Sequence, residues 1–232
     1  MTAAQPIEPA RGFRQALADQ HGLSVIAEIK RRSPSKGDLN VGLDPADLAT
    51  TYAQGGAACL SVLTDVEFFG GAVADLQSAR AATSLPVLRK DFTVSASDVV
   101  DTRLIGADCV LLIAAALDKH ELIEWHHLAV EIGLDALVEV HDESELDVAI
   151  EAGATLVGVN QRDLVTFEVD HDRAARMASA IPAEVVKVAE SGVRGGDDAR
   201  RLADVGYDAI LVGESLVTAA DPAAALTVLR AG

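Results

Sequence analysis

Two ionisable residues, Glu28 and Lys30, end an apolar run near the N-terminus, in the segment VIAEIKRRSPSKG. If this run is a β-strand, the side-chain period of two places both groups on the same face. A carboxylate beside an ammonium can act on a substrate as general base and general acid. An ion pair that closes the end of a sheet is the alternative, so this segment alone leaves its role open.

Similar groups follow the later apolar runs. Lys90 ends PVLRKDF, Glu139 lies in LVEVHD, Asn160 and Arg162 alternate in GVNQRD, and Glu190 begins the turn ESG. Buried ion pairs often add no net stability, so several titratable groups at different strand ends are poorly explained by folding alone. They predict acid–base catalysis if the fold brings these strand ends together, because proximity and partial burial separate the proton affinities of the groups.

Two glycine-containing turns close the last two apolar runs of the chain, ESG and GES. Glycine lets a ligand approach the backbone closely, and the N–H groups at the start of a short helix attract anions. The pair of turns therefore predicts a phosphate-binding site made by Ser191, Gly192, Gly213, Glu214 and Ser215.

The elements that must position these residues repeat one unit, an apolar run, a polar or glycine-bearing loop and an amphipathic helical stretch. The predicted strands are Ser24–Ile29, Ala57–Leu63, Pro86–Arg89, Asp108–Ile113, Ala136–Glu139, Thr155–Val159, Val185–Ala189 and Ala209–Val212. The predicted helices between and after them are Asp44–Gly55, Ala72–Thr83, Ser95–Ile105, Lys119–Ile132, Glu143–Ala152, Asp172–Ala180, Asp197–Val205 and Pro222–Leu229.

This alternation predicts an α/β fold, a single (β/α)8 TIM barrel over residues 1–232 with a short N-terminal helical extension over residues 1–23. The extension is expected to hold a helix from Pro9 to His21. An open doubly wound sheet usually has fewer strands and a G-x-G-x-x-G loop after the first one, and neither feature fits this chain. In a barrel the carboxyl ends of all strands share one face, where catalytic residues collect.

The composition of the chain limits the kinds of molecule that it is expected to bind. The 232 residues carry a formal charge of −17, which argues against nucleic acid, whereas cations such as Lys30, Lys36 and Lys90 gather at strand ends and favour an anionic small molecule. Arg31, Arg32, Arg89, Arg162 and Arg194 occupy similar places. Half of the residues are apolar but only 3% are aromatic, as in parallel sheets covered by helices.

The expected environment is the cytoplasm. Cys59 and Cys109 lie inside apolar runs, so they are expected to be reduced, packed thiols with no metal between them. The longest apolar run, from Cys109 to Leu117, is too short to span a bilayer, and residues 1–11 lack the order of a signal peptide. We therefore expect no membrane association.

The chain resembles the indole-3-glycerol phosphate synthases of tryptophan biosynthesis. The resemblance rests on SVIAEIKRRSPSKG, SVLTDVEFFGG, PVLRKDF, ADCVLLIAAAL, ALVEVHDESEL, GATLVGVNQRDLVTFEVD, VVKVAESGV and DAILVGESL, which follow one another in the family's order. It implies a barrel enzyme that converts 1-(2-carboxyphenylamino)-1-deoxyribulose 5-phosphate to indole-3-glycerol phosphate, with loss of carbon dioxide and water and without a metal or organic cofactor.

The resemblance also implies roles for single residues. Lys90 matches the acid for ring closure, Lys30 and Glu28 match the acid and base for dehydration, and Glu139 matches a further catalytic glutamate that could be base, acid or electrostatic partner. The residues that match substrate contacts are Ser33, Asn160 and Arg162 at the carboxylate and sugar hydroxyls, Glu190 at the hydroxyls, and Phe69 and Phe92 beside the aromatic ring. Ordinary core packing is the alternative for the two phenylalanines.

The chain differs from the family pattern at two points. Two other functions are alternatives at this stage. The N-terminal extension, which in the family helps to cover the substrate mouth, is short here. Gln161 stands where Asn or Ser is more usual, and little consequence is expected because the alternation of a strand turns this side chain away from the barrel axis. The chain could be another phosphate-sugar barrel isomerase, although Lys90 would then be unexplained, or a catalytically silent barrel with a binding role. Contact with other tryptophan-pathway enzymes is a further expectation.

Overall fold

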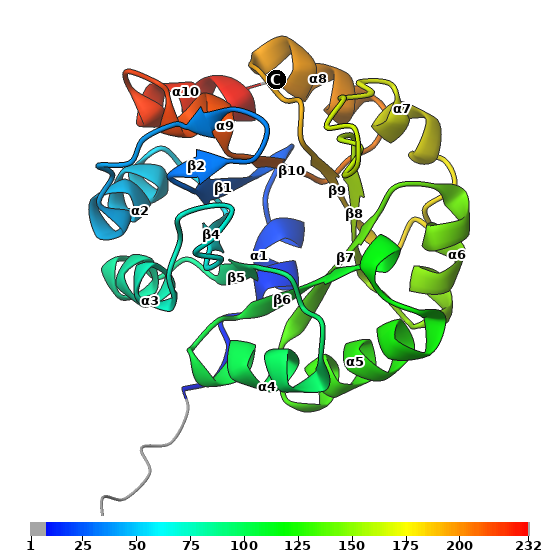
Figure 1. The fold of residues 1–232 in the computed structure, drawn as a ribbon. Coiled ribbons are helices and arrows are strands. Elements are labelled where there is room, and N and C mark those ends of the chain that lie inside the picture. Colours follow the sequence, from blue (N-terminus) through cyan, green and yellow to red (C-terminus); the bar gives the residue numbers. More distant parts are fainter. Residues whose placement is uncertain (1–7, 232) are drawn as a thin grey trace, which may run out of the picture.

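The structure, a computed structural model, describes residues 8–231, and its centre is a closed barrel of parallel strands (Figure 1). Around the barrel the strands follow the order β1-β10-β9-β8-β7-β6-β5-β4, so each pairs with its neighbours in sequence and the last pairs with the first. The strands are β1 (Ser24–Ile29), β4 (Cys59–Leu63), β5 (Val87–Lys90), β6 (Cys109–Ile113), β7 (Asp135–Val140), β8 (Leu156–Asn160), β9 (Val186–Glu190) and β10 (Ala209–Val212). The predicted (β/α)8 TIM barrel is confirmed.

Helices surround the barrel and connect successive strands (Figure 1). They are α2 (Pro45–Gln54), α3 (Val73–Ala82), α4 (Ala96–Leu104), α5 (Lys119–Glu131), α6 (Glu143–Glu151), α7 (Arg173–Met177), α8 (Gly196–Asp204), α9 (Glu214–Val217) and α10 (Pro222–Arg230). Clear start signals support several of these helices. Asp44 accepts hydrogen bonds from the first turn of α2, and Asp118 and Glu121 form a capping box on α5.

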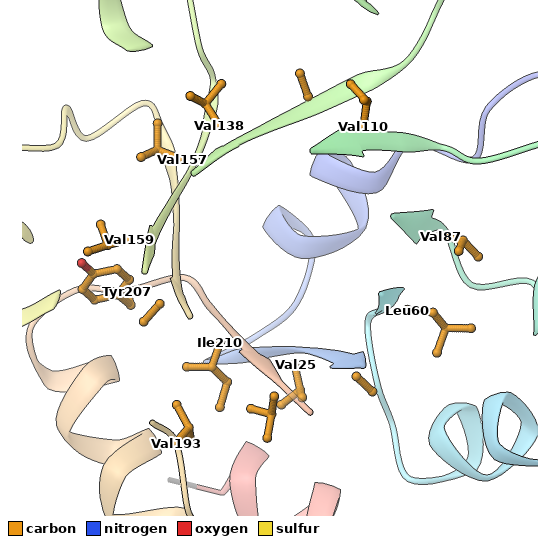
Figure 2. Packing of buried hydrophobic residues seen from close by; sticks show 14 of the residues in the cluster. Val25, Leu60, Val87, Val110, Val138, Val157, Val159, Val193, Tyr207 and Ile210 are labelled. Atoms are coloured by element: carbon orange, nitrogen blue, oxygen red, sulfur yellow. The ribbon is translucent and has the colours of Figure 1, made fainter. Parts of the chain in front are cut away.

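Side chains alternate between two cores along each strand. Val25, Val87, Val110 and Val138 point outward to the helices, as the cluster in Figure 2 shows. The residues that follow them by one position point inward and fill the barrel, and they include Ile26, Leu88, Leu111 and Glu139. The same alternation places Cys59 and Cys109 inside the barrel as buried free thiols.

The N-terminal helix α1 (Phe13–Ala18) plugs the barrel at the end opposite the cavity described below. Phe13 and Leu17 are buried among the interior side chains, and the N–H groups of Arg11 and Arg14 donate to Asp108 and Asp135 where β6 and β7 begin. Figure 1 shows α1 inside the ring of strands. The described part of the extension therefore seals the base of the barrel.

Some predicted bounds were wrong. Helix α1 has six residues instead of spanning 9–21, because the chain before it is held by Asp108 and a left-handed Gly12 precedes its first turn. Helix α7 ends at Met177 and not at Ala180, before the Ile181-Pro182 step that disfavours helical backbone. The sequence also did not predict the two-stranded hairpin β2 (Arg32–Ser33) and β3 (Gly37–Asp38) or the short 3-10 helix Ala114–Ala116.

Within residues 8–231, no helix is both long and apolar enough to cross a membrane. No group of three or more His, Cys, Asp or Glu side chains in that range is arranged to hold a metal ion.

Candidate active site

A cavity of about 810 Å³ opens at the carboxyl ends of the barrel strands. Every catalytic, substrate-binding and phosphate-binding residue that the sequence predicted lines it. These residues come from distant parts of the chain and meet because parallel strands in a closed barrel all end on one face. The predicted set is therefore brought together in full.

Lys90 is the centre of the buried charge network. Its Nζ donates to Glu139 Oε2 at 2.8 Å and to Glu190 Oε2 at 3.0 Å, and its side chain is 16% exposed. Asn160 Nδ2 donates to the other oxygen of Glu139 at 2.8 Å. Lys90, Asn160 and Glu190 end β5, β8 and β9, and Glu139 is the last residue but one of β7, so all four side chains meet at the cavity.

The two carboxylates around Lys90 differ in proton affinity. Burial raises the pKa of Glu139, but the charge of Lys90 and the hydrogen bond from Asn160 outweigh burial and hold this pKa below its usual range. Burial raises the pKa of Glu190 to about 7, because one ammonium cannot balance two carboxylates equally. Glu190 Oε1 is buried and finds no hydrogen-bond partner in the described chain. Glu139 is therefore the ionised partner of Lys90, and Glu190 takes up a proton near neutral pH.

Burial also lowers the proton affinity of Lys90, but the charges of Glu139 and Glu190 more than offset this effect. The pKa of Lys90 is therefore raised above its ordinary value. In this state Lys90 is fully protonated and holds its proton tightly. A group that weakens the hold of these carboxylates would make Lys90 a stronger acid.

A second pair, Glu28 and Lys30, lies on β1 and the loop after it, two strands from Lys90 on one side and from Glu190 on the other. Lys30 Nζ is 2.7 Å from Glu28 Oε1, and Ser61 Oγ donates to Glu28 Oε2 at 3.4 Å. A Cβ atom at Gly213 would overlap the carboxylate of Glu28 and lie 2.9 Å from Lys30 Nζ. Glycine at this position thus makes room for the pair as well as for a ligand at the turn.

Asn160 and Arg162 are linked through the backbone. The N–H of Arg162 donates to Asn160 Oδ1 at 3.0 Å, while the guanidinium of Arg162 donates to the carbonyl of Phe167 at 2.8 Å. Ser33, in the hairpin, is buried, and its hydroxyl has no hydrogen-bond partner within residues 8–231 although it lies at the cavity. A polar ligand would supply the partner that this hydroxyl lacks.

Aromatic side chains form the rim. The rings of Phe69 and Phe92 have centroids 6.5 Å apart, and Phe68 meets Phe92 edge to face at 6.3 Å. Phe92 is 46% exposed, so ordinary core packing does not explain it. The sequence missed the apolar wall below this rim, which includes Leu63, Leu111 and Leu211, because nothing in those strands separates cavity-facing from core-facing leucines.

The predicted phosphate site has an unusual backbone. Ser191 and Gly192 both have left-handed conformations, with φ of 67° and 77°, and such strain in a residue other than glycine is common at functional sites. The side-chain amide of Gln161 donates to the carbonyl of Ser191 at 2.8 Å. Gln161 was expected to have little effect because it points away from the barrel axis, but it is buried and holds this turn.

The second half of the predicted phosphate site is the start of helix α9. Gly213 precedes the helix, Glu214 and Ser215 form its first turn, and Ser215 Oγ donates to the carbonyl of Val193 at 3.1 Å. Ser215 thereby ties the two turns together. Lys36 Nζ lies 3.8 Å from Glu214 Oε1, so a cation from the first loop reaches this end of the cavity.

The cations at the strand ends divide into two groups. Lys30, Lys36, Lys90, Arg162 and Arg194 line the cavity. The others do not. Arg31 pairs with Asp75 of α3, Arg89 bonds to Thr64, Asp91 and Thr102 behind the barrel wall, and Arg32 lies on the exposed side of the hairpin. Sequence position alone could not separate these groups, because a shift of one residue reverses the direction of a strand side chain.

Gly158, inside β8, is a further residue on which the site depends. A Cβ atom there would overlap Glu190 Oε1 and lie 3.2 Å from Leu137 Cδ1. We expect Gly158→Ala to displace the Glu190 carboxylate from Lys90 and to reduce kcat about tenfold, since small errors in position are costly in catalysis. Steady-state kinetics would measure this change. Gly42→Ala is the matched control, because a Cβ atom at Gly42 meets no other atom within 4 Å; equal kcat values for the two variants would contradict the steric role of Gly158.

Comparison with known proteins places the chain among close relatives. Residues 2–229 match the family model described as indole-3-glycerol phosphate synthase. The indole-3-glycerol phosphate synthase of a Nocardioides species is 54% identical over 221 residues, which cover 95% of this chain and 83% of that protein. Indole-3-glycerol phosphate synthase 1 of Streptomyces coelicolor is 54% identical over 228 residues, which cover 98% of this chain and 84% of that protein.

A solved structure, thiamine phosphate pyrophosphorylase from Pyrococcus furiosus, superimposes with a TM-score of 0.66 and 17% identity. The match covers 90% of this chain and 94% of that one. A likeness at this identity supports the barrel fold and nothing more.

Proposed function

The chain belongs to the indole-3-glycerol phosphate synthase family, and we propose that the Lys90 network and the Glu28–Lys30 pair carry out successive halves of its reaction. The enzyme is a carboxy-lyase of tryptophan biosynthesis. It converts 1-(2-carboxyphenylamino)-1-deoxyribulose 5-phosphate to indole-3-glycerol phosphate, carbon dioxide and water. The observation that carries the assignment of roles is the presence in one cavity of two ammonium groups with their own carboxylate partners, Lys90 with Glu139 and Lys30 with Glu28.

The first half of the reaction forms a carbon–carbon bond. The ring carbon that bears the carboxylate attacks the ketose carbonyl, and the carbonyl oxygen must take a proton as it becomes a hydroxyl. Lys90 supplies this proton from the base of the cavity, while the ionised Glu139 stabilises and orients its ammonium. Glu139 thus acts as an electrostatic partner. Loss of carbon dioxide then returns the bonding electrons to the aromatic ring.

The second half of the reaction is dehydration. The new hydroxyl leaves as water after it receives a proton from Lys30, and Glu28 removes the proton from the adjacent carbon so that the indole double bond forms. Glu28 and Lys30 are 2.7 Å apart, so a proton taken by the base can return to the acid after turnover. The two ammoniums thus serve the same oxygen in succession, Lys90 when the carbonyl becomes a hydroxyl and Lys30 when that hydroxyl leaves as water.

Binding groups surround these two clusters. The phosphate lies against the backbone N–H groups of the Ser191–Gly192 turn and of Gly213 to Ser215, where glycine allows close approach. Ser33, Asn160 and Arg162 contact the carboxylate and hydroxyls, Glu190 contacts the hydroxyls, and Phe69 with Phe92 packs on the aromatic ring. The lysines and arginines of the cavity attract the anionic substrate to an otherwise acidic protein.

The setting of the enzyme is part of the same proposal. Residues 1–232 act as one barrel domain in the cytoplasm, where the free thiols of Cys59 and Cys109 stay reduced. Contact with other enzymes of tryptophan biosynthesis remains a prediction.

The function is tested by a turnover assay with the purified protein. The arylaminoribulose phosphate is added, and the rise of indole fluorescence is followed above the constant signal of Trp125, the tryptophan of the chain. We expect one equivalent of carbon dioxide for each indole formed. Tight binding of the substrate without indole formation would support the silent-barrel reading instead, and release of an isomerised sugar phosphate would support an isomerase.

A further inference from the structure

His141, which follows β7 by one residue, lies next to the catalytic network at Glu139. Its Nδ1 is 3.2 Å from Glu145 Oε2 and its backbone N–H donates to the same oxygen at 2.7 Å. Its Nε2 is 3.8 Å from Glu139 Oε1. That nitrogen is buried and has no hydrogen-bond partner in the part of the chain described. The imidazole therefore lies between two carboxylates, one on helix α6 and one in the active site.

The geometry favours a proton on each ring nitrogen. Because the ionised Glu145 only accepts hydrogen bonds, Nδ1 must carry a proton toward it. In a neutral ring Nε2 would then direct a lone pair at the carboxylate of Glu139. A second proton on Nε2 removes this repulsion and supplies a positive charge that faces Glu139.

We propose that His141 is a positioning residue for the ring-closure step. As an imidazolium hydrogen-bonded to Glu145, it attracts the carboxylate of Glu139 and thereby weakens the interaction of that carboxylate with Lys90. The inference rests on the proposed function of Lys90 as the acid. A Lys90 ammonium held less tightly gives up its proton more readily to the substrate oxygen. Loss of the charge on His141 slows ring closure without removing any group that touches the substrate.

The charged groups around His141 agree with this assignment. Burial lowers the proton affinity of the ring, but the hydrogen bond to Glu145 and the charges of Glu139 and Glu145 outweigh burial, so the pKa of His141 is raised above 6.5. Arg173 of α7 opposes this effect, and Asp142 lies beside the ring in sequence. The imidazolium is present at low pH and is lost as the pH rises through this raised pKa, so ring closure slows over the same interval.

The test is a pH profile of single turnovers with enzyme in excess, so that product release does not limit the rate. We expect the wild-type rate to fall about fivefold across a step above pH 6.5. His141→Gln should give the slower rate and lose the fivefold step, leaving only the smaller change that titration of Glu190, whose pKa is about 7, causes beside Lys90. Glu145→Gln keeps an oxygen for the backbone N–H of His141 but removes the charge, so its step should move to lower pH. The NMR titration of the His141 ring should move with it.

Glu143→Gln is the matched control. Glu143 is an exposed residue in the same turn of α6, and its removal changes the charge of the helix without a contact to the ring. This variant should keep the wild-type profile. A wild-type profile without the step, a step of undiminished size in His141→Gln, or a step that Glu145→Gln leaves in place would overturn the role of His141. Absence of indole formation by the wild type at every pH would instead overturn the proposed function.

Discussion

Replacement of Lys90 by methionine is expected to lower kcat by about 10³-fold, because the substrate carbonyl then finds no acid during ring closure. Both carbon dioxide release and indole formation should be lost together, since decarboxylation can follow only after the carbon–carbon bond has formed. Binding of indole-3-glycerol phosphate should persist, because the phosphate turns lie on other strands. Turnover is measured by fluorescence and binding by calorimetric titration with the product.

Removal of the Lys90 ammonium also leaves Glu139 and Glu190 without their shared cation, so a second variant separates chemistry from folding. Lys90→Arg keeps the positive charge but holds its proton too strongly to act as an acid. It should fold normally by thermal melting and still lose most of its activity. Lys119→Met changes an exposed lysine that pairs with Glu151 and serves as the control. Normal turnover by either Lys90 variant would exclude Lys90 as the acid.

Replacement of Glu28 by glutamine is expected to slow dehydration by about 10²-fold while ring closure continues, because the base of the second cluster is lost and the first cluster is intact. In a single turnover, carbon dioxide should be released at close to the wild-type rate and indole fluorescence should lag behind it. The separation of the two signals distinguishes this variant from Lys90→Met. Radiolabelled carbon dioxide and stopped-flow fluorescence measure the two events.

The control for this change is Glu151→Gln. Glu151 pairs with Lys119 at 2.7 Å, the same separation as Glu28 and Lys30, but the pair lies exposed on helices α5 and α6. Neither signal should change in that variant. If carbon dioxide and indole slow equally in Glu28→Gln, then Glu28 does not belong to the dehydration step and its role before decarboxylation must be reconsidered.

Most of the fold could be predicted because each strand is marked by its own apolar run. The runs Ser24–Ile29 and Ala209–Val212 were predicted with their observed bounds, and the other barrel strands differ by no more than two residues at either end. Errors occurred where tertiary contacts set the local structure. The length of α1 depends on hydrogen bonds to Asp108 and Asp135, which lie about a hundred residues away in the chain.

The active site, like the fold, was predictable in part. Residue type and spacing were sufficient to select Glu28, Lys30, Lys90, Glu139 and Glu190, because ionisable groups at the ends of apolar strands are unusual and a barrel gathers strand ends on one face. The period of two predicted that Glu28 and Lys30 lie side by side, but the partners of Lys90 could not be predicted. Only the structure places Lys90 between Glu139 and Glu190. Spacing along the chain does not specify which strands are opposite one another across a closed barrel.

The sequence by itself determined the alternation of strands and helices, the acidic surface, the identity of the reactive groups and the family. These properties depend on residue type and on short-range periodicity. The tertiary structure alone decided which of these groups are protonated, because the pKa of a buried carboxyl depends on desolvation and on the charges beside it. It also decided that Gly158 must lack a side chain, that Gln161 supports the Ser191 turn, and that His141 lies beside Glu139.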